Sequence, residues 1–383
     1  MNIPKLRFKE FTDEWVYYKY KDIFNLNQGL QIPITERFLD YAPNRFFYIT
    51  NEFLKPSSKK SYYIENPSPN VICTKEDILM TRTGNTGKVI TNIAGVFHNN
   101  FFRIKYNPKN FNKDFICCIL NQNKIQNKIL TLAGSSTIPD LNHKDFYSIK
   151  SRFPKLKEQE KIAKFINTVD KKIENIENTI SSLENQKKGL LQQIFSQKLR
   201  FKDENGNNYP NWKKKKLGDL FTIKAGGDIN KENFSEQYSI EFKYPVYANA
   251  LTNNGLYGYS NIYKIDKPSI TVTGRGINVG FALSREPFYY PIVRLLVLIP
   301  NININFTFFT ESINFIHIFN ESTGVPQLTA PQLSKVNVYV PNIEEQNKIG
   351  NLFDKLNEKI DNKKAQLEHW QQIKKGLLQQ MFV

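Results

Sequence analysis

The sequence predicts an α+β protein: two mixed α/β globular domains joined by two long antiparallel coiled-coil helices, with an internal pseudo-two-fold repeat. Three observations lead to this prediction: motifs that occur twice in the same order, two long heptad patterns, and short strand-like runs between them. The expected segments are a first domain, a first helix, a second domain and a second helix, at residues 1–153, 154–197, 198–340 and 341–383.

The duplication rests on an ordered series of matches. The run KGLLQQ at residues 188–193 returns unchanged at residues 375–380, an offset of 187 residues. The same offset relates Pro154 to Pro341, whereas Trp15 and Trp212 near the two starts are 197 residues apart. About ten residues are therefore missing from inside the second copy. Residues 31–76 have no clear counterpart in residues 228–268, so we expect a conserved frame with different interiors.

Each copy ends in a helix pattern. Apolar residues recur at alternating spacings of three and four over more than four heptads, which predicts a coiled-coil seam. Residues assigned to these spacer and partner-binding helices are Ile162, Ile166, Ile173, Leu190, Ile349, Phe353, Ile360 and Leu377. Lys187 and Lys374 interrupt the two seams at the same place. We expect the two helices to pair within one chain; packing on separate domains, or homodimerisation through one seam, remains an alternative.

Between these anchors the apolar runs are short and rich in Ile, Val, Phe and Tyr, as in residues 71–73, 78–80 and 270–272. Such runs, separated by Asn, Gly and Pro, predict strands. Residues 110–129 and 306–319 look helical. Each domain is therefore expected to mix a sheet with helices.

The composition favours a polyanionic partner. Lys and Arg number 53 against 36 Asp and Glu, a formal net charge of +17. An excess of this kind suits nucleic acid, because neutralising phosphates releases counterions. Three cysteines form no disulfide framework, and no apolar run reaches the ~18 residues of a membrane span. We therefore expect a soluble, cytoplasmic protein without a membrane partner.

Catalytic motifs are not found. Residues 81–88 superficially suggest a phosphate-binding loop, but only two residues separate Gly84 and Gly87, where four are required. There is no methyltransferase or glycine-rich cofactor motif, and the four scattered histidines make no zinc pattern with the cysteines. We expect no catalytic residue, metal or cofactor in this chain.

Polar loops are the candidate DNA contacts. Base edges are read by Arg, Asn, Gln, Ser and Thr, and glycine lets the backbone approach the duplex. One loop is matched in the two copies as Arg82, Thr83, Gly84 and Asn85 with Arg275, Gly276, Ile277 and Asn278. A second is matched as Ser135, Ser136 and Thr137 with Ser322, Thr323, Gly324 and Gln327. Lys88 and a third loop, assigned only to the first copy, add Asn99, Asn100 and Arg103. The same residues are ordinary turn formers, so turn chemistry is the competing interpretation.

The whole pattern resembles the specificity subunits of type I restriction-modification systems. The resemblance is carried by residues 134–141 (GSSTIPDL), by Pro154 with Glu158 and Gln159, by the second copies of both, and by the helices that end in GLLQQ. It covers the entire chain.

The resemblance implies two target-recognition domains, each reading half of a split double-stranded DNA sequence, with the helices setting the spacer. It also implies two methyltransferase (modification) subunits and two ATP-driven restriction subunits as partners. S-adenosylmethionine, ATP and Mg²⁺ would then belong to those partners. A coiled-coil scaffold that binds only protein is the alternative function.

Overall fold

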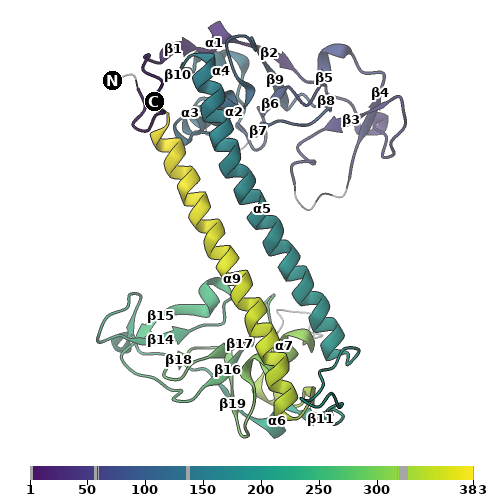
Figure 1. Ribbon diagram of the computed structural model, residues 1–383, viewed down its shortest axis with the longest axis vertical. Coiled ribbons are helices and arrows are strands. Elements are labelled where there is room, and N and C mark those ends of the chain that lie inside the picture. Colours follow the sequence, from purple (N-terminus) through teal and green to yellow (C-terminus); the bar gives the residue numbers. More distant parts are fainter. Residues whose placement is uncertain are drawn as a thin grey trace. The chain divides into compact units, whose positions relative to one another are not determined.

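The computed structural model describes residues 3–55, 58, 60–134, 139–316, 318 and 327–382. The chain divides into two compact units (Figure 1). Unit 1 comprises Met1–Ile176 with Gln366–Val383, and unit 2 comprises Glu177–Ala365. Each unit therefore contains part of both long helices, α5 (Leu156–Phe195) and α9 (Ile343–Gln380).

The main sheet of unit 1 is antiparallel and four-stranded. Its order is β2 (Phe24–Gln28), β9 (Phe101–Tyr106), β6 (Ile78–Thr81) and β7 (Val89–Ile90). Alternate residues point to opposite faces of a strand. Ile78 and Met80 belong to the core shared with helices α2 (Lys113–Leu120), α3 (Asn123–Ala133) and α4 (His143–Ser148), whereas Leu79 belongs to a second cluster. Burial on both faces explains the continuous apolar run.

A second sheet in unit 1 has the order β4 (Tyr63–Glu65), β3 (Arg45–Ile49), β8 (Gly95–Phe97) and β5 (Ile72–Cys73). The pairing of β3 with β8 is parallel. Strand β1 (Val16–Lys19) pairs with β10 (Lys150–Phe153), directly before the long helix begins. Short turns α1 (Tyr20–Ile23), η1 (Ile34–Glu36) and η2 (Pro69–Val71) complete the described elements of this unit.

Unit 2 repeats this plan. Its main sheet has the order β12 (Phe221–Ala225), β19 (Leu295–Pro300), β16 (Ser269–Thr273) and β17 (Ala282–Arg285). Helices α7 (Phe306–Ile316) and α8 (Ala330–Ser334) share the core of that sheet. Strand β11 (Lys213–Lys216) pairs with β20 (Asn337–Val340), as β1 does with β10. The short elements are α6 (Leu217–Leu220), η3 (Lys231–Asn233) and η4 (Thr252–Gly255).

The second sheets show that the interiors are related too. In unit 2 the order is β13 (Phe234–Ser235), β15 (Leu256–Ser260), β14 (Tyr244–Tyr247) and β18 (Tyr290–Pro291), with β14 parallel to β18. Strands β15, β14 and β18 thus have the same order and directions as β4, β3 and β8. The fourth strand differs: β5 pairs with β8 in unit 1, whereas β13 pairs with β15 in unit 2. The sequences of residues 31–76 and 228–268 differ as expected, yet the two segments share a strand topology, because backbone pairing has been kept while the side chains changed.

The long helices run antiparallel within each unit. In unit 1, Ile162 and Ile166 near the start of α5 share a core with Met381 and Phe382, and Asp170, one turn on, pairs with Lys374 at 2.6 Å. In unit 2, the rings of Phe195 and Phe353 stack with centroids 6.3 Å apart. Glu184, earlier on α5, pairs at 2.8 Å with Lys364, later on α9. The pairing of the two helices within one chain is therefore confirmed.

The apolar seam lies inside the units. Ile162, Ile166, Ile349, Phe353 and Ile360 are buried, and Leu190 and Leu377 pack against the cores of units 2 and 1. The remaining seam residue, Ile173, is half-buried. These side chains therefore pack within the cores of their own units, and their additional role in binding a partner stays a prediction.

A buried carboxylate anchors the start of each long helix. The Arg7 guanidinium donates to both oxygens of Glu158 at 2.7 Å, and the Trp15 indole N–H donates to Oε1 at 3.3 Å. In unit 2, Glu345 accepts from Arg200 and Trp212 in the same way. Both carboxylates are almost fully buried. The N-terminal arm of each unit is thereby fixed to its helix.

The glutamine that follows ties the helix to the domain. The Gln159 side chain accepts from the Asn112 backbone N–H and donates to the Asn110 and Pro154 carbonyls. Gln346 accepts from the Asn305 N–H in the equivalent place. The recurrence of the Glu-Gln pair therefore has a structural cause. Among the described residues, no helix combines the length and apolarity that a bilayer crossing requires.

Replacing Glu345 by Ala should destabilise unit 2 by about 1–3 kcal/mol, because it leaves the buried Trp212 N–H without its acceptor and the partly buried Arg200 guanidinium without its carboxylate. Urea unfolding with hydrogen exchange read separately in each unit measures this effect. Glu344→Ala, at the exposed neighbouring position, is the matched control. Equal losses in the two variants would show that the buried carboxylate is not the anchor.

Candidate nucleic-acid interface

Three predicted loops converge in unit 1. The Arg82 N–H donates to the Asn100 carbonyl at 2.7 Å, and the Leu141 N–H donates to the Arg82 carbonyl at 3.0 Å. The loop after β6, the loop before β9 and the segment before α4 are therefore neighbours. Ser135, Ser136 and Thr137 lie outside the described residues, and the described chain resumes beside this junction at Pro139.

The loop after β6 is a tight turn that needs left-handed backbone. Gly84, Asn85 and Gly87 have φ of 65°, 55° and 90°, which glycine and asparagine adopt most readily. The Thr81 hydroxyl donates to the Asn85 carbonyl at 2.5 Å. Asn85 and Lys88 are exposed. Of the predicted residues in this loop, these two present free side chains to solvent.

Arg82 and Thr83 are engaged within the protein. The Arg82 guanidinium donates hydrogen bonds from Nε and Nη2 to the Asp140 carboxylate at 2.9 and 2.5 Å. The Thr83 hydroxyl donates to the same carboxylate at 2.6 Å. The hydrogen bond from Arg82 is the main reason why the pKa of Asp140 is lowered; it outweighs the opposing effect of desolvation, and the Thr83 hydrogen bond lowers the pKa further. These side chains lock two loops together.

The third loop of unit 1 contributes two amides. Asn99 donates its side-chain amide to Gln31 at 2.8 Å, and Asn100 is partly exposed. Arg103 does not join them. It is 7% exposed and donates to the Ile72 and Asn70 carbonyls, with Asp77 3.7 Å away. The prediction of Arg103 as a DNA contact is therefore corrected: the alternation of β9 turns this side chain into unit 1.

Unit 2 has the same junction, but its residues are shifted by one position from the match that the sequence suggested. The Gly274 N–H donates to the Arg294 carbonyl at 2.9 Å, and the Leu328 N–H donates to the Gly274 carbonyl at 2.8 Å. Gly274 thus takes the place of Arg82, and Arg275 that of Thr83. The matched arginines are not equivalent, because the loop from Thr273 to Gly280 is one residue longer than its counterpart.

This shift changes the charge of the junction. The backbone of Arg275 forms an isolated antiparallel β-bridge with Gln327, at the place where Thr83 forms one with Asp140 in unit 1. No hydrogen bond or ion pair holds the Arg275 guanidinium in the described part of the chain, whereas Arg82 is neutralised by its carboxylate. Gly276 has φ of 91°, and Asn278 and Gln327 are exposed. Ser322, Thr323 and Gly324 lie outside the described residues.

The third loop exists in unit 2 as well. Gly226 donates to the Leu295 carbonyl as Gly29 does to that of Phe101, which aligns Ile292, Val293 and Arg294 with residues 98–100. The assignment of this loop to the first copy alone was wrong, because the apolar residues suggest a strand that begins earlier than β19 does. Arg294 is exposed, with φ of 70°.

Two asparagines that no sequence pattern indicated brace these loops. The Asn51 amide donates to the Thr83 carbonyl at 2.8 Å. Asn249 donates to the Arg275 carbonyl at 2.8 Å and accepts from the Gly274 and Arg275 N–H groups at 2.6 and 3.1 Å. The two asparagines occupy equivalent positions after β3 and β14. The only signal available was their place after a strand, in regions whose sequences do not align.

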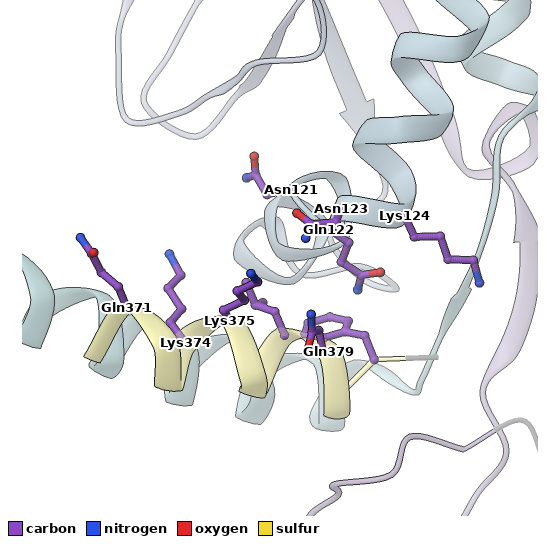
Figure 2. A pocket seen from close by; sticks show the side chains of 10 residues that line it. Asn121, Gln122, Asn123, Lys124, Gln371, Lys374, Lys375 and Gln379 are labelled. Atoms are coloured by element: carbon purple, nitrogen blue, oxygen red, sulfur yellow. The ribbon is translucent and has the colours of Figure 1, made fainter. Parts of the chain in front are cut away.

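A separate cavity of about 470 Å³ lies in unit 1 beside the last turns of α9 (Figure 2). Its lining includes Asn121, Gln122 and Lys124 together with Lys375 and Gln379 of α9. No group of three or more His, Cys, Asp or Glu residues within the described ranges is arranged to hold a metal ion.

Comparison with known proteins identifies the repeated unit. A family model described as the Type I restriction modification DNA specificity domain matches residues 12–185 and again residues 209–370. The chain belongs to this family. Each match covers one copy of the duplicated frame together with most of its long helix.

Named relatives agree. The chain is 28% identical over 218 residues to a protein named as a type I specificity subunit from Mycoplasma pneumoniae, covering 57% of this chain and 58% of that one. It is 21% identical to the specificity subunit of a type I restriction enzyme from Methanocaldococcus jannaschii, covering 98% and 94%. The crystal structure of a type I restriction-modification S subunit from M. genitalium has the same fold, with a TM-score of 0.70, 19% identity and coverage of 100% and 99%.

Replacing Asp140 by Asn should raise amide exchange across residues 82–88, because Arg82 and Thr83 lose their shared carboxylate. In the unaltered protein the same loosening should begin only below the ordinary Asp pKa of about 4. The pKa of Asp140 is lowered in the folded state, so the tie is present above that range and is lost as the pH falls through the folded pKa. Residues 274–280, whose loop has no such carboxylate, are the internal control. Unchanged exchange in Asp140→Asn would contradict the locking role.

Proposed function

We propose that the chain is the DNA-reading, non-catalytic specificity subunit of a type I restriction-modification complex. Each unit reads one half of a bipartite site in double-stranded DNA. The observation that carries this proposal is the loop junction, which is built twice on the same backbone hydrogen bonds and carries different side chains in the two units. A protein that recognises two unlike half-sites needs this combination.

Charge supports DNA as the partner. The formal net charge is +17, and the four lysines of β11 are all exposed. Lysine contacts to phosphates orient a protein on DNA without reading its sequence, and polar side chains in the grooves supply the specificity. The exposed Asn85 and Asn278 have the chemistry to read base edges.

The remaining parts of the assembly are proposed from the family. The chain spans 58% of the length of the first relative. We infer a complex with two methyltransferase subunits and, for cleavage, two restriction subunits, working in the cytoplasm. S-adenosylmethionine, ATP and Mg²⁺ would be held by those subunits.

We propose that the two long helices α5 and α9 determine the spacing between the two DNA half-sites. Because α5 and α9 each contribute to both units, their length sets the separation of the two half-sites. Their apolar stripe is used inside the units, which leaves the polar faces for the methyltransferase subunits.

Inserting one heptad into each helix, within residues 177–183 and 366–371, should lengthen the spacer and leave both half-sites unchanged. Seven residues add about 10 Å of helix at about 1.5 Å per residue. That length corresponds to about three base pairs at about 3.4 Å each. Methylome sequencing of cells that carry the variant with its partner subunits gives the motif directly.

Seven alanines inserted into one helix only are the matched control, because they break the antiparallel register and should abolish the motif. Altered half-sites with an unchanged spacer would refute this role of the helices. A wild-type complex that methylates no defined motif would instead favour a scaffold without DNA readout.

A further inference from the structure

One loop of unit 2 exposes an apolar side chain without a counterpart in unit 1. Ile277, between Gly276 and Asn278, is 96% exposed. The loop after β6 has polar Asn85 at its exposed tip. Single exposed apolar side chains are common on protein surfaces, but Ile277 lies in the loop junction, where the apolar surface of a bound ligand can bury it.

The loop that carries Ile277 is closed by its own hydrogen bonds. The Thr273 hydroxyl donates to the Asn278 carbonyl and accepts from the Phe281 N–H. The Gly280 N–H donates to the Thr273 carbonyl at 2.8 Å, and that of Val279 donates to the Gly276 carbonyl at 3.1 Å. The isoleucine is thus presented by a defined turn.

Two guanidiniums that have no ion-pair partner among the described residues accompany this side chain. Arg275 is braced through its backbone by Asn249, and Arg294 is joined to the same loop through the Gly274 N–H. Neither side chain has an ion-pair partner among the residues that the structure describes. In unit 1 the corresponding positions are Thr83 and Asn100, and the nearby Arg82 is held by Asp140.

We propose that unit 2 reads a guanine next to a thymine in the major groove, through Arg275 and Ile277, and that Arg82 of unit 1 is a positioning residue. This inference rests on the proposed function. Arginine pairs with the O6 and N7 acceptors of guanine, and an apolar side chain contacts the C5 methyl group of thymine. Both features lie in the major groove, where one short loop reaches adjacent bases. Unit 1, with amides and a hydroxyl in these places, has no equivalent methyl contact.

The experiment removes single groups from the DNA. The chain in complex with its methyltransferase subunits is titrated, at one fixed salt concentration, with duplexes that carry its methylated motif. Each thymine of the half-site read by unit 2 is replaced in turn by uracil, which lacks only the methyl group. Each guanine is replaced by 7-deazaguanine, which lacks the N7 acceptor.

One uracil position should weaken binding of the wild-type complex about fourfold, the effect of losing one buried methyl group. The Ile277→Ala complex should be insensitive to that replacement. At the adjacent guanine, Arg275→Gln should cost between about 5-fold and about 150-fold, and 7-deazaguanine should then have no further effect. Asn85→Ala, at the tip of the unit 1 loop, is the matched control and should leave both sensitivities intact.

Arg82→Gln provides the contrast. A positioning residue should weaken discrimination at several bases of the half-site read by unit 1 and raise amide exchange in residues 82–88, without removing sensitivity to any one guanine N7. Loss of sensitivity to one guanine N7 would make Arg82 a base contact and overturn that part of the proposal.

Equal sensitivity of wild type and Ile277→Ala to every uracil would overturn the thymine contact. A different result would also overturn the thymine contact: the wild-type complex is insensitive to every uracil, and Ile277→Ala bends the DNA less than wild type does. That result would indicate that Ile277 is an apolar wedge between base pairs. Thermal unfolding of Ile277→Ala should match wild type, since the side chain is exposed. If the wild-type complex prefers no sequence, the proposed function itself fails; specific binding without these sensitivities refutes this inference alone.

Discussion

The buried carboxylate at the start of each long helix is the interaction on which the rest of the structure depends. Glu158 and Glu345 each bind an arginine from the preceding arm and the indole of a tryptophan. A carboxylate without water is tolerated only when its charge and lone pairs are matched in this way. The adjacent glutamines then fasten the domain helices to the same turn. Arm, helix and domain of each unit therefore meet at one residue pair.

The duplication has preserved backbone geometry more strictly than side chains. Both units keep the parallel strand pair and the hydrogen bonds that gather three loops at one junction. At that junction the aspartate of unit 1 is replaced by the glutamine of unit 2, and the loop gains a residue. These changes leave the sheets intact, because the loop ends are fixed by main-chain bonds. Specificity can therefore vary without cost to the frame.

Lys187 and Lys374 show the same principle on the helices. Lys187 pairs with Glu311 of α7 at 2.6 Å, whereas Lys374, its counterpart, pairs with Asp170 of α5. At the site equivalent to Asp170, unit 2 has Asn357, which donates to Glu311. The acidic residue thus lies on a different helix in each unit, but the lysine forms an ion pair in both. The seam break predicted from sequence is therefore an ion-pair site within each unit.

The sequence was sufficient for the fold class, the repeat and the antiparallel helices, since heptads and duplicated motifs are periodic signals. It was insufficient for the loop junction. The match of Arg82 with Arg275 failed because a one-residue insertion is invisible in a glycine-rich loop. Asn51, Asn249 and Arg294 were missed because strand pairing, which places them, leaves no local pattern. Arg103 was misassigned because a polar residue in a strand can point to either face.

The central claim is that each unit reads its own half-site. It is tested most directly by a chain in which residues 1–197 are replaced by a second copy of residues 198–383. Such a chain keeps the ion pair between the long helices and α7, because Lys374 of one copy can pair with Glu311 of the other as Lys187 does. With its partner subunits it should methylate a symmetric motif made of two copies of the unit 2 half-site, as methylome sequencing would show. A motif that still has two unlike halves would contradict the account.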